Sequence, residues 1–99
     1  MTYLDRLAAK IEQEVPGDLL PDMNTRPLFR LYAVLALAKG TTVEVADVHN
    51  AWAAWMQERQ PSHRSLVPFD ELDPETRAAD EPFAQAIRTM AQHLAENAY

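Results

Sequence analysis

The sequence predicts an all-α fold, a small bundle of four to five helices with an extended, proline-containing connection over about residues 60–69. Apolar residues recur three and four positions apart along most of the chain, and no segment alternates with the period of two that is typical of strands. Capping residues, prolines and glycines separate these segments. The chain has 99 residues, so we expect a single helical domain over residues 1–99.

The first helix is expected over residues 3–14. Thr2 is suited to cap its start, and Asp5 places a negative charge in the first turn, where the helix dipole favours it. Pro16 and Gly17 end the helix. One apolar face is predicted to hold Leu4, Leu7, Ala8, Ile11 and Val15. The apolar residues of the following loop, which should fold back onto the core, are Leu19, Leu20 and Met23.

The second helix should follow Thr25 as its N-cap, with Pro27 in the first turn, where no intrahelical partner is lost. Lys39 in the last turn and Gly40 just beyond it mark the end. Its apolar stripe is broad and predicts a central, largely buried helix. The stripe consists of Leu28, Leu31, Tyr32, Leu35 and Ala36, widened by Phe29, Val34 and Leu37.

The third helix is predicted to begin with a capping box at residues 41–44, in which Glu44 reaches back to the cap, and to end near Gln57 or Arg59. Its apolar face holds Val45, Val48, His49, Trp52, Trp55 and Met56. After the connection, Asp73-Pro74-Glu75 is typical of a further helix start. Pro82 should kink that helix or restart it with Asp80 as cap, and the last helix then runs to about Glu96. It should turn inward Phe83, Ile87, Met90 and Leu94.

The charge balance excludes several classes of partner. Fifteen acids and nine bases give a net charge of -6, which disfavours a nucleic-acid partner. The short glycine turn at Gly40 joins two helices as in a helix-turn-helix motif. The helix that follows, however, offers Glu44 and Asp47 where a DNA-binding helix needs arginine, lysine or asparagine.

No apolar run is long enough to span a membrane, and no signal peptide is expected. The absence of cysteine, with arginine favoured over lysine, predicts a cytoplasmic protein of bacterial or phage origin.

The polar side chains do not form a recognisable catalytic or metal-binding pattern. His49, His63 and His93 are too widely spaced for a typical zinc site, and we predict no metal and no cofactor. Ser62, His63 and Asp70 are the residue types of a nucleophilic triad, but no glycine is available for a nucleophile elbow. The acids of residues 70–81 lack the glycine of a calcium loop, so they are read as helix caps and a solvated face. No catalytic residue is therefore assigned, and the protein is not expected to be an enzyme.

The large aromatic residues are the best candidates for a binding surface. Trp52 and Trp55 lie three positions apart and cover more than one side of their helix, so one of them is free to stack on a ligand or partner. Tyr32 and Phe69 are the other large aromatics expected to build a pocket or an interface.

From about residue 45 to residue 87 the chain resembles the ryanodine-receptor repeat domain. The resemblance rests on His49-Asn50-Ala51-Trp52, then His63-Arg64-Ser65-Leu66-Val67-Pro68-Phe69-Asp70-Glu71-Leu72, then a helix with spaced acids that ends at Asp80. The chain departs from the family pattern in three places. Asn50 stands where the family usually has aspartate, and Phe69 stands where it usually has tyrosine. The family's Gly-Trp-x-Tyr-Gly segment between the two motifs is missing.

This resemblance implies a helical module that senses a small, nucleotide-derived ligand. The ligand would lie between the third helix and the segment Pro61–Leu72, here called the strap. The expected ligand-binding residues, taken with the aromatic pattern, are His49, Trp52, Trp55, His63, Phe69 and Asp70. The alternative is a protein–protein interaction or self-associating accessory protein, which binds a protein partner or forms a homodimer through the broad apolar face of the second helix.

Overall fold

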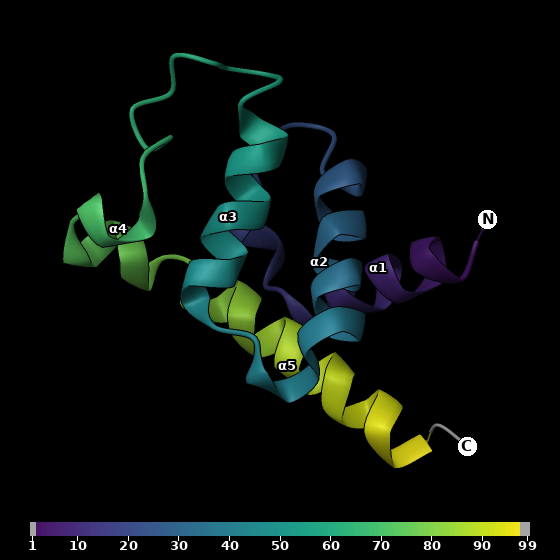
Figure 1. Ribbon diagram of the computed structural model, residues 1–99. Coiled ribbons are helices and arrows are strands. Elements are labelled where there is room, and N and C mark those ends of the chain that lie inside the picture. The colour runs from purple at the N-terminus through teal and green to yellow at the C-terminus, as the bar shows by residue number, and fades with distance from the viewer. Residues whose placement is uncertain (1, 98–99) are drawn as a thin grey trace.

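The helices lie as the sequence predicts. The computed structural model describes residues 2–97, and within that range it contains α-helices and short 3₁₀ turns but no strand (Figure 1). The helices are α1 (Tyr3–Glu14), α2 (Arg26–Lys39), α3 (Val45–Met56), α4 (Pro74–Ala78) and α5 (Glu81–Asn97), and the 3₁₀ turns are η1 (Gly17–Leu19), η2 (Gly40–Thr42) and η3 (Phe69–Glu71). The prediction of an all-α fold with four to five helices is confirmed.

Helices α1 and α2 pack side by side and are tied at the surface. Thr2 is the N-cap of α1, as expected, and the structure adds a capping box between Thr2 and Asp5. The same Asp5 carboxylate accepts a hydrogen bond from Arg30 Nε of α2 at 2.6 Å. Of the loop residues expected to fold back, Leu20 and Met23 pack against the core, whereas Leu19 remains 42% exposed.

Helix α2 is central but not buried on every side. Phe29 and Tyr32 are almost fully buried and meet edge to face, with ring centroids 5.1 Å apart. Val34 and Leu37, which the sequence placed in the buried stripe, are instead 48% and 51% exposed. The prediction was wrong for these two positions because α1, α3 and α5 pack on one side of α2 and leave the opposite side to solvent.

The turn between α2 and α3 corrects the predicted capping box. Gly40 has a φ of +59°, a conformation that favours glycine, and residues 40–42 continue as a 3₁₀ turn. Helix α3 therefore starts three residues later than expected, with Glu44 as its N-cap. The backbone N–H of Glu44 donates to the Asp47 carboxylate at 2.8 Å, and Lys39 Nζ donates to that same carboxylate at 2.9 Å. Burial alone would raise the pKa of Asp47, but these hydrogen bonds outweigh it and the pKa is lowered.

The strap crosses from the end of α3 to α4 (Figure 1), and its η3 turn contacts α3. Leu72 is buried and Leu66 packs on the core cluster. The strap also receives a hydrogen bond from α3, where His49 Nε2 lies 2.7 Å from the carbonyl oxygen of Val67. These contacts fix a segment without regular structure close to the aromatic face of α3.

Pro82 restarts the last helix, as predicted. Helix α4 is capped by Asp73, whose carboxylate accepts from the Thr76 N–H at 2.8 Å, and it ends at Ala78. Helix α5 begins at Glu81, and the backbone carbonyl of Asp80 accepts its first hydrogen bonds from Phe83 and Ala84. The Asp80 side chain makes no hydrogen bond to the helix within residues 2–97, so this residue stands at the cap position without capping through its carboxylate.

Helix α5 closes the bundle beneath α2 and α3, with Ile87 and Met90 buried and Phe83 and Leu94 packed against the core. None of the helices within residues 2–97 has the length and apolar character needed to cross a membrane.

Candidate functional site: adjoining hollows around Trp52 and Asp80

Trp52 is the centre of an aromatic cluster that joins α3 to the strap. Its indole stacks on the imidazole of His49, one helical turn earlier, with ring centroids 5.6 Å apart and planes at 24°. It also meets the edge of His63 in the strap at 5.0 Å and 81°. The indole is half-buried, so part of its surface remains available to a ligand.

The larger hollow beside Trp52 has a volume of about 280 Å³. It lies where the loop before α2, helix α2, helix α3 and the α4–α5 junction meet. Its walls are apolar and aromatic except for one carboxylate. The residues that line it are Leu19, Pro21, Leu28, Tyr32, Trp52, Ala79, Asp80 and Phe83.

A smaller hollow of about 120 Å³ lies on the strap side of the same tryptophan. Its lining residues are His49, Trp52, Ser65, Thr76, Ala79 and Asp80. Trp52, Ala79 and Asp80 line both hollows, which therefore adjoin and share one wall. A ligand that occupies the larger hollow would touch the indole and the carboxylate together.

Asp80 is the one charged group on these walls. Burial raises its pKa to about 6, and the nearby His49 lowers it in part. Within residues 2–97 its carboxylate has neither a hydrogen-bond partner nor an ion-pair partner. A half-buried carboxylate that lacks a partner and faces open space is a group that a ligand can satisfy.

Tyr32 faces the same space from α2. Burial raises the pKa of its phenol, and the nearby negative charge of Asp80 raises it further, so the hydroxyl stays protonated and neutral at physiological pH. Its ring lies 6.0 Å from that of Phe83. The two rings form an aromatic wall next to the carboxylate.

His49 serves as a buried structural histidine at the edge of the site. It is 3% exposed, and because the Val67 carbonyl can only accept, Nε2 must carry the hydrogen and donate it. Its ring also lies 6.1 Å from that of Phe69. Its ring forms part of the smaller hollow, while its hydrogen bond holds the strap in place.

The other predicted site residues are distributed more widely. His63 supports Trp52, and its Nδ1 accepts from the Ser65 N–H at 3.0 Å. Trp55 is 2% exposed in the core, with the Arg59 guanidinium 4.7 Å from its ring centroid, and it lines neither hollow. Phe69 lies between His49 and the guanidinium of Arg77, which is 5.8 Å from its ring. Asp70 is exposed and also lies outside both hollows.

Sequence reasoning did not place Asp80, Ala79 and Phe83 in the site. Asp80 was read as a helix cap because it precedes Pro82, and the acid at that position gives no sign of which way its side chain turns. Phe83 was assigned to the core by its helical spacing. The break between α4 and α5 is the signal that could have found them, since a helix restart exposes side chains that a continuous helix would bury.

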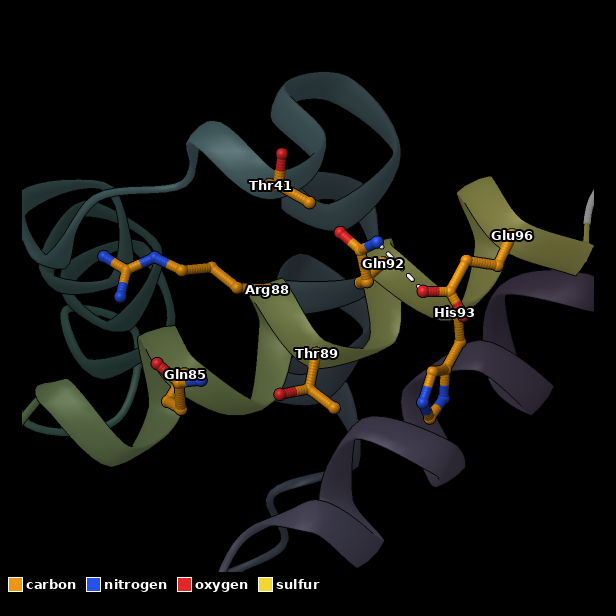
Figure 2. Close-up of a pocket in the computed structure, with 7 residues that line it drawn as sticks. All are labelled: Thr41, Gln85, Arg88, Thr89, Gln92, His93 and Glu96. Atoms are coloured by element: carbon orange, nitrogen blue, oxygen red, sulfur yellow. Dashed lines mark hydrogen bonds between the residues drawn. The ribbon is translucent and has the colours of Figure 1, made fainter.

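A separate groove of about 370 Å³ runs along α5 and is lined by polar and charged residues. Figure 2 shows its residues along one side of α5, with Thr41 facing them from η2. Its main charged groups are already engaged, because Arg88 donates to the Val43 carbonyl and to Glu81, and Gln92 donates to Glu96. The groove has no aromatic wall. The complete lining is Thr41, Gln85, Arg88, Thr89, Gln92, His93 and Glu96.

The side chains at the hollows offer a ligand hydrogen bonds and aromatic surface. Within residues 2–97 no group of three histidine, aspartate or glutamate side chains gathers in a way that could hold a metal ion. The polar side-chain groups of the residues that line the two hollows are one carboxylate, one imidazole, one indole N–H and three hydroxyls. They can orient a small molecule through hydrogen bonds while the aromatic rings cover its apolar surface.

Comparison with known families corrects the resemblance suggested by the sequence. A family model described as "Domain of unknown function (DUF7701)" matches residues 2–92, and no ryanodine-receptor repeat family was found. The match includes the first 40 residues, which the ryanodine-receptor pattern left without a counterpart. The motif residues have an explanation in packing, because His49 bonds to Val67 while Leu66 and Leu72 cover the core. No curated protein and no solved structure matches the chain.

Proposed function

The chain belongs to the DUF7701 family, and on the geometry of its hollows we propose that it is a non-enzymatic module that binds a small organic molecule. The observation that carries this proposal is that Trp52 and Asp80 together line two adjoining hollows. The indole offers apolar surface, and the carboxylate is a hydrogen-bond acceptor that has no partner among residues 2–97.

The size and lining of the hollows support a ligand smaller than a typical drug molecule. Ligand sites commonly have volumes of roughly 300–1,000 Å³ and are mostly apolar with a few polar groups. The larger hollow, at about 280 Å³, lies at the lower end of that range and has this mixture of groups. The cytoplasmic location expected from the composition remains part of the proposal.

A nucleotide is no longer the favoured ligand. That expectation came from the ryanodine-receptor resemblance, which the family match replaces. Neither hollow is lined by lysine or arginine, and Asp80 would repel a phosphate. The site therefore favours a ligand without phosphate groups.

A fragment screen followed by ¹H–¹⁵N NMR tests the proposal. We expect hits whose chemical-shift changes concentrate at the Trp52 indole N–H and at the amides of Ala79, Asp80 and Phe83. Trp52→Ala should weaken such hits by about tenfold, because the stacking surface is lost. A circular dichroism spectrum checks that the variant remains helical.

Leu37→Ala is the matched control, because it also truncates a large apolar side chain that is partly exposed but lies on α2 outside both hollows. It should leave the fragment affinities unchanged. The proposal is contradicted if no fragment binds, or if all hits shift residues of other surfaces and bind the Trp52 variant as well as the original protein.

The second candidate function is self-association or docking of a protein partner. Val34 and Leu37 lie one helical turn apart on the outer side of α2 and are about half exposed, which favours this candidate. Multi-angle light scattering over a concentration series tests it. A concentration-dependent dimer that the double variant Val34→Lys, Leu37→Lys abolishes would support it, and a monomer throughout would argue against the homodimer.

A further inference from the structure

Building on the proposed function, we infer that the ligand class of the larger hollow is a small organic cation, such as a quaternary or primary ammonium group with a short apolar part. The inference rests on which side chains meet there. Three aromatic residues, Tyr32, Trp52 and Phe83, line the hollow together with Asp80, and no lysine, arginine or histidine does.

Aromatic rings attract cations through the negative charge of their faces, and tryptophan and tyrosine do so most strongly. Tyr32 and Phe83 lie with ring centroids 6.0 Å apart and planes at 47°, so they form two adjacent walls rather than a flat stack. Trp52 from α3 lines the hollow as well. Rings on several sides of one space are the arrangement that recognises alkylated ammonium groups.

The carboxylate supplies the counter-charge. Asp80 lacks a cationic partner within residues 2–97, although the chain contains nine lysines and arginines. The neighbouring Arg77 is engaged elsewhere, since it donates to the Leu72 carbonyl at 2.8 Å and lies over Phe69. A bound cation would satisfy the carboxylate and offset the cost of its partial burial, the same burial that raises its pKa to about 6.

The position of His49 decides between the two hollows. His49 lines the smaller hollow but not the larger one. A cation in the smaller hollow would lie beside this imidazole and would meet only Trp52 of the three aromatic residues that line the larger hollow. The ammonium group of the ligand is therefore assigned to the larger hollow. The smaller hollow can take an apolar or hydroxyl-bearing part of the same ligand next to Ser65 and Thr76.

Choline and 3,3-dimethylbutan-1-ol are the probes, because they have nearly the same shape. They differ in charge, since the alcohol has a neutral carbon where choline has its positively charged nitrogen. Each is titrated into ¹⁵N-labelled protein at pH 7.5, where Asp80 is ionised. We expect choline to shift the Trp52 indole N–H and the Ala79 and Asp80 amides, with an affinity at least about tenfold above that of the alcohol. Asp80→Asn keeps the shape of the site and should remove this preference. Asp70→Asn, which changes net charge equally but lies outside the hollow, should keep it.

The outcomes separate this inference from the proposed function. If the alcohol binds as tightly as choline, or if Asp80→Asn keeps the preference, the cation assignment is wrong while the hollow still binds ligands. If choline leaves these signals unchanged while neutral or anionic fragments shift them, the assignment is also wrong and the proposed function stands. If choline, the alcohol and the fragment library all leave them unchanged, both fail.

Discussion

His49 Nε2 lies 2.7 Å from the carbonyl oxygen of Val67, and this hydrogen bond fixes the strap to α3 beside the site. The donor is buried, and its ring also stacks on Trp52 at 5.6 Å. One side chain thus positions both the indole that lines the hollows and the segment that borders them.

The first prediction concerns this bond. His49→Ala should lower the free energy of unfolding by about 1–3 kcal/mol, because it leaves the Val67 carbonyl without its donor and opens a gap beside Trp52. Urea denaturation measures the change. Asn50→Ala, at the exposed neighbouring position, is the matched control and should change stability by less than about 0.5 kcal/mol. If His49→Ala and Asn50→Ala change the free energy of unfolding equally, the hydrogen bond between His49 and Val67 contributes nothing to stability.

Replacing Trp55 should cost little. Its Nε1 is the one side-chain donor or acceptor within residues 2–97 that is buried without a hydrogen-bond partner. Trp55→Phe removes that unsatisfied donor while it leaves a small cavity, so we expect a change in unfolding free energy below about 1.5 kcal/mol. The variant also leaves Trp52 as the single tryptophan. Urea unfolding followed by circular dichroism checks the prediction, and a loss above about 3 kcal/mol, the range of a well-satisfied core residue, would contradict it.

Asp80 should make stability depend on pH in an unusual direction. Its folded pKa of about 6 is above the ordinary aspartate value of 3.8, so the folded state holds the proton more tightly than the unfolded state. The stability that this tighter proton binding gives the folded state is fully present below about pH 3.8 and is lost as pH rises through about 6. Asp80→Asn should therefore raise stability at pH 7.5 by about 1 kcal/mol, a value reduced for solvent screening, and leave it nearly unchanged at pH 4. Paired urea titrations at the two pH values measure the difference, and a variant less stable at pH 7.5 would contradict it.

Asp5 should behave in the opposite way. The hydrogen bond from Arg30, followed by that from the Thr2 backbone, lowers its pKa from 3.8 to about 2. Its contribution to stability is present above about pH 3.8 and is lost as pH falls through about 2. An NMR titration of the side-chain carboxyl should give a midpoint near 2, and Arg30→Gln should move that midpoint back toward 3.8. A midpoint that Arg30→Gln leaves in place would assign the shift to the capping box alone.

The helices could be predicted because local signals and apolar spacing agree along the chain. Thr2 with Asp5, Pro27 after Thr25, and Pro74 after Asp73 each mark a helix start that the structure contains. The start of α3 was misplaced because two segments offer the same spacing of capping groups. Residues 41–44 and 44–47 both fit the pattern, and the choice depends on Gly40 and on Lys39 bonding to Asp47.

The site could be predicted only in part. Trp52 and His49 share one face of a helix, so their proximity follows from their spacing. Asp80 and Tyr32 are separated by 48 positions, and nothing in their local sequence indicates that they meet. Their meeting depends on how α5 crosses α2, which is a property of the packed core. Likewise, the exposure of Val34 and Leu37 depends on which sides of α2 the other helices cover.

The most direct measurement is an isotope-filtered NOE spectrum of the protein with its best-binding fragment. We expect NOEs from the fragment to the Trp52 indole, the Ala79 methyl group and the Phe83 ring, since these groups line the larger hollow. NOEs confined to the α5 groove, at Thr89 and Gln92, would contradict it.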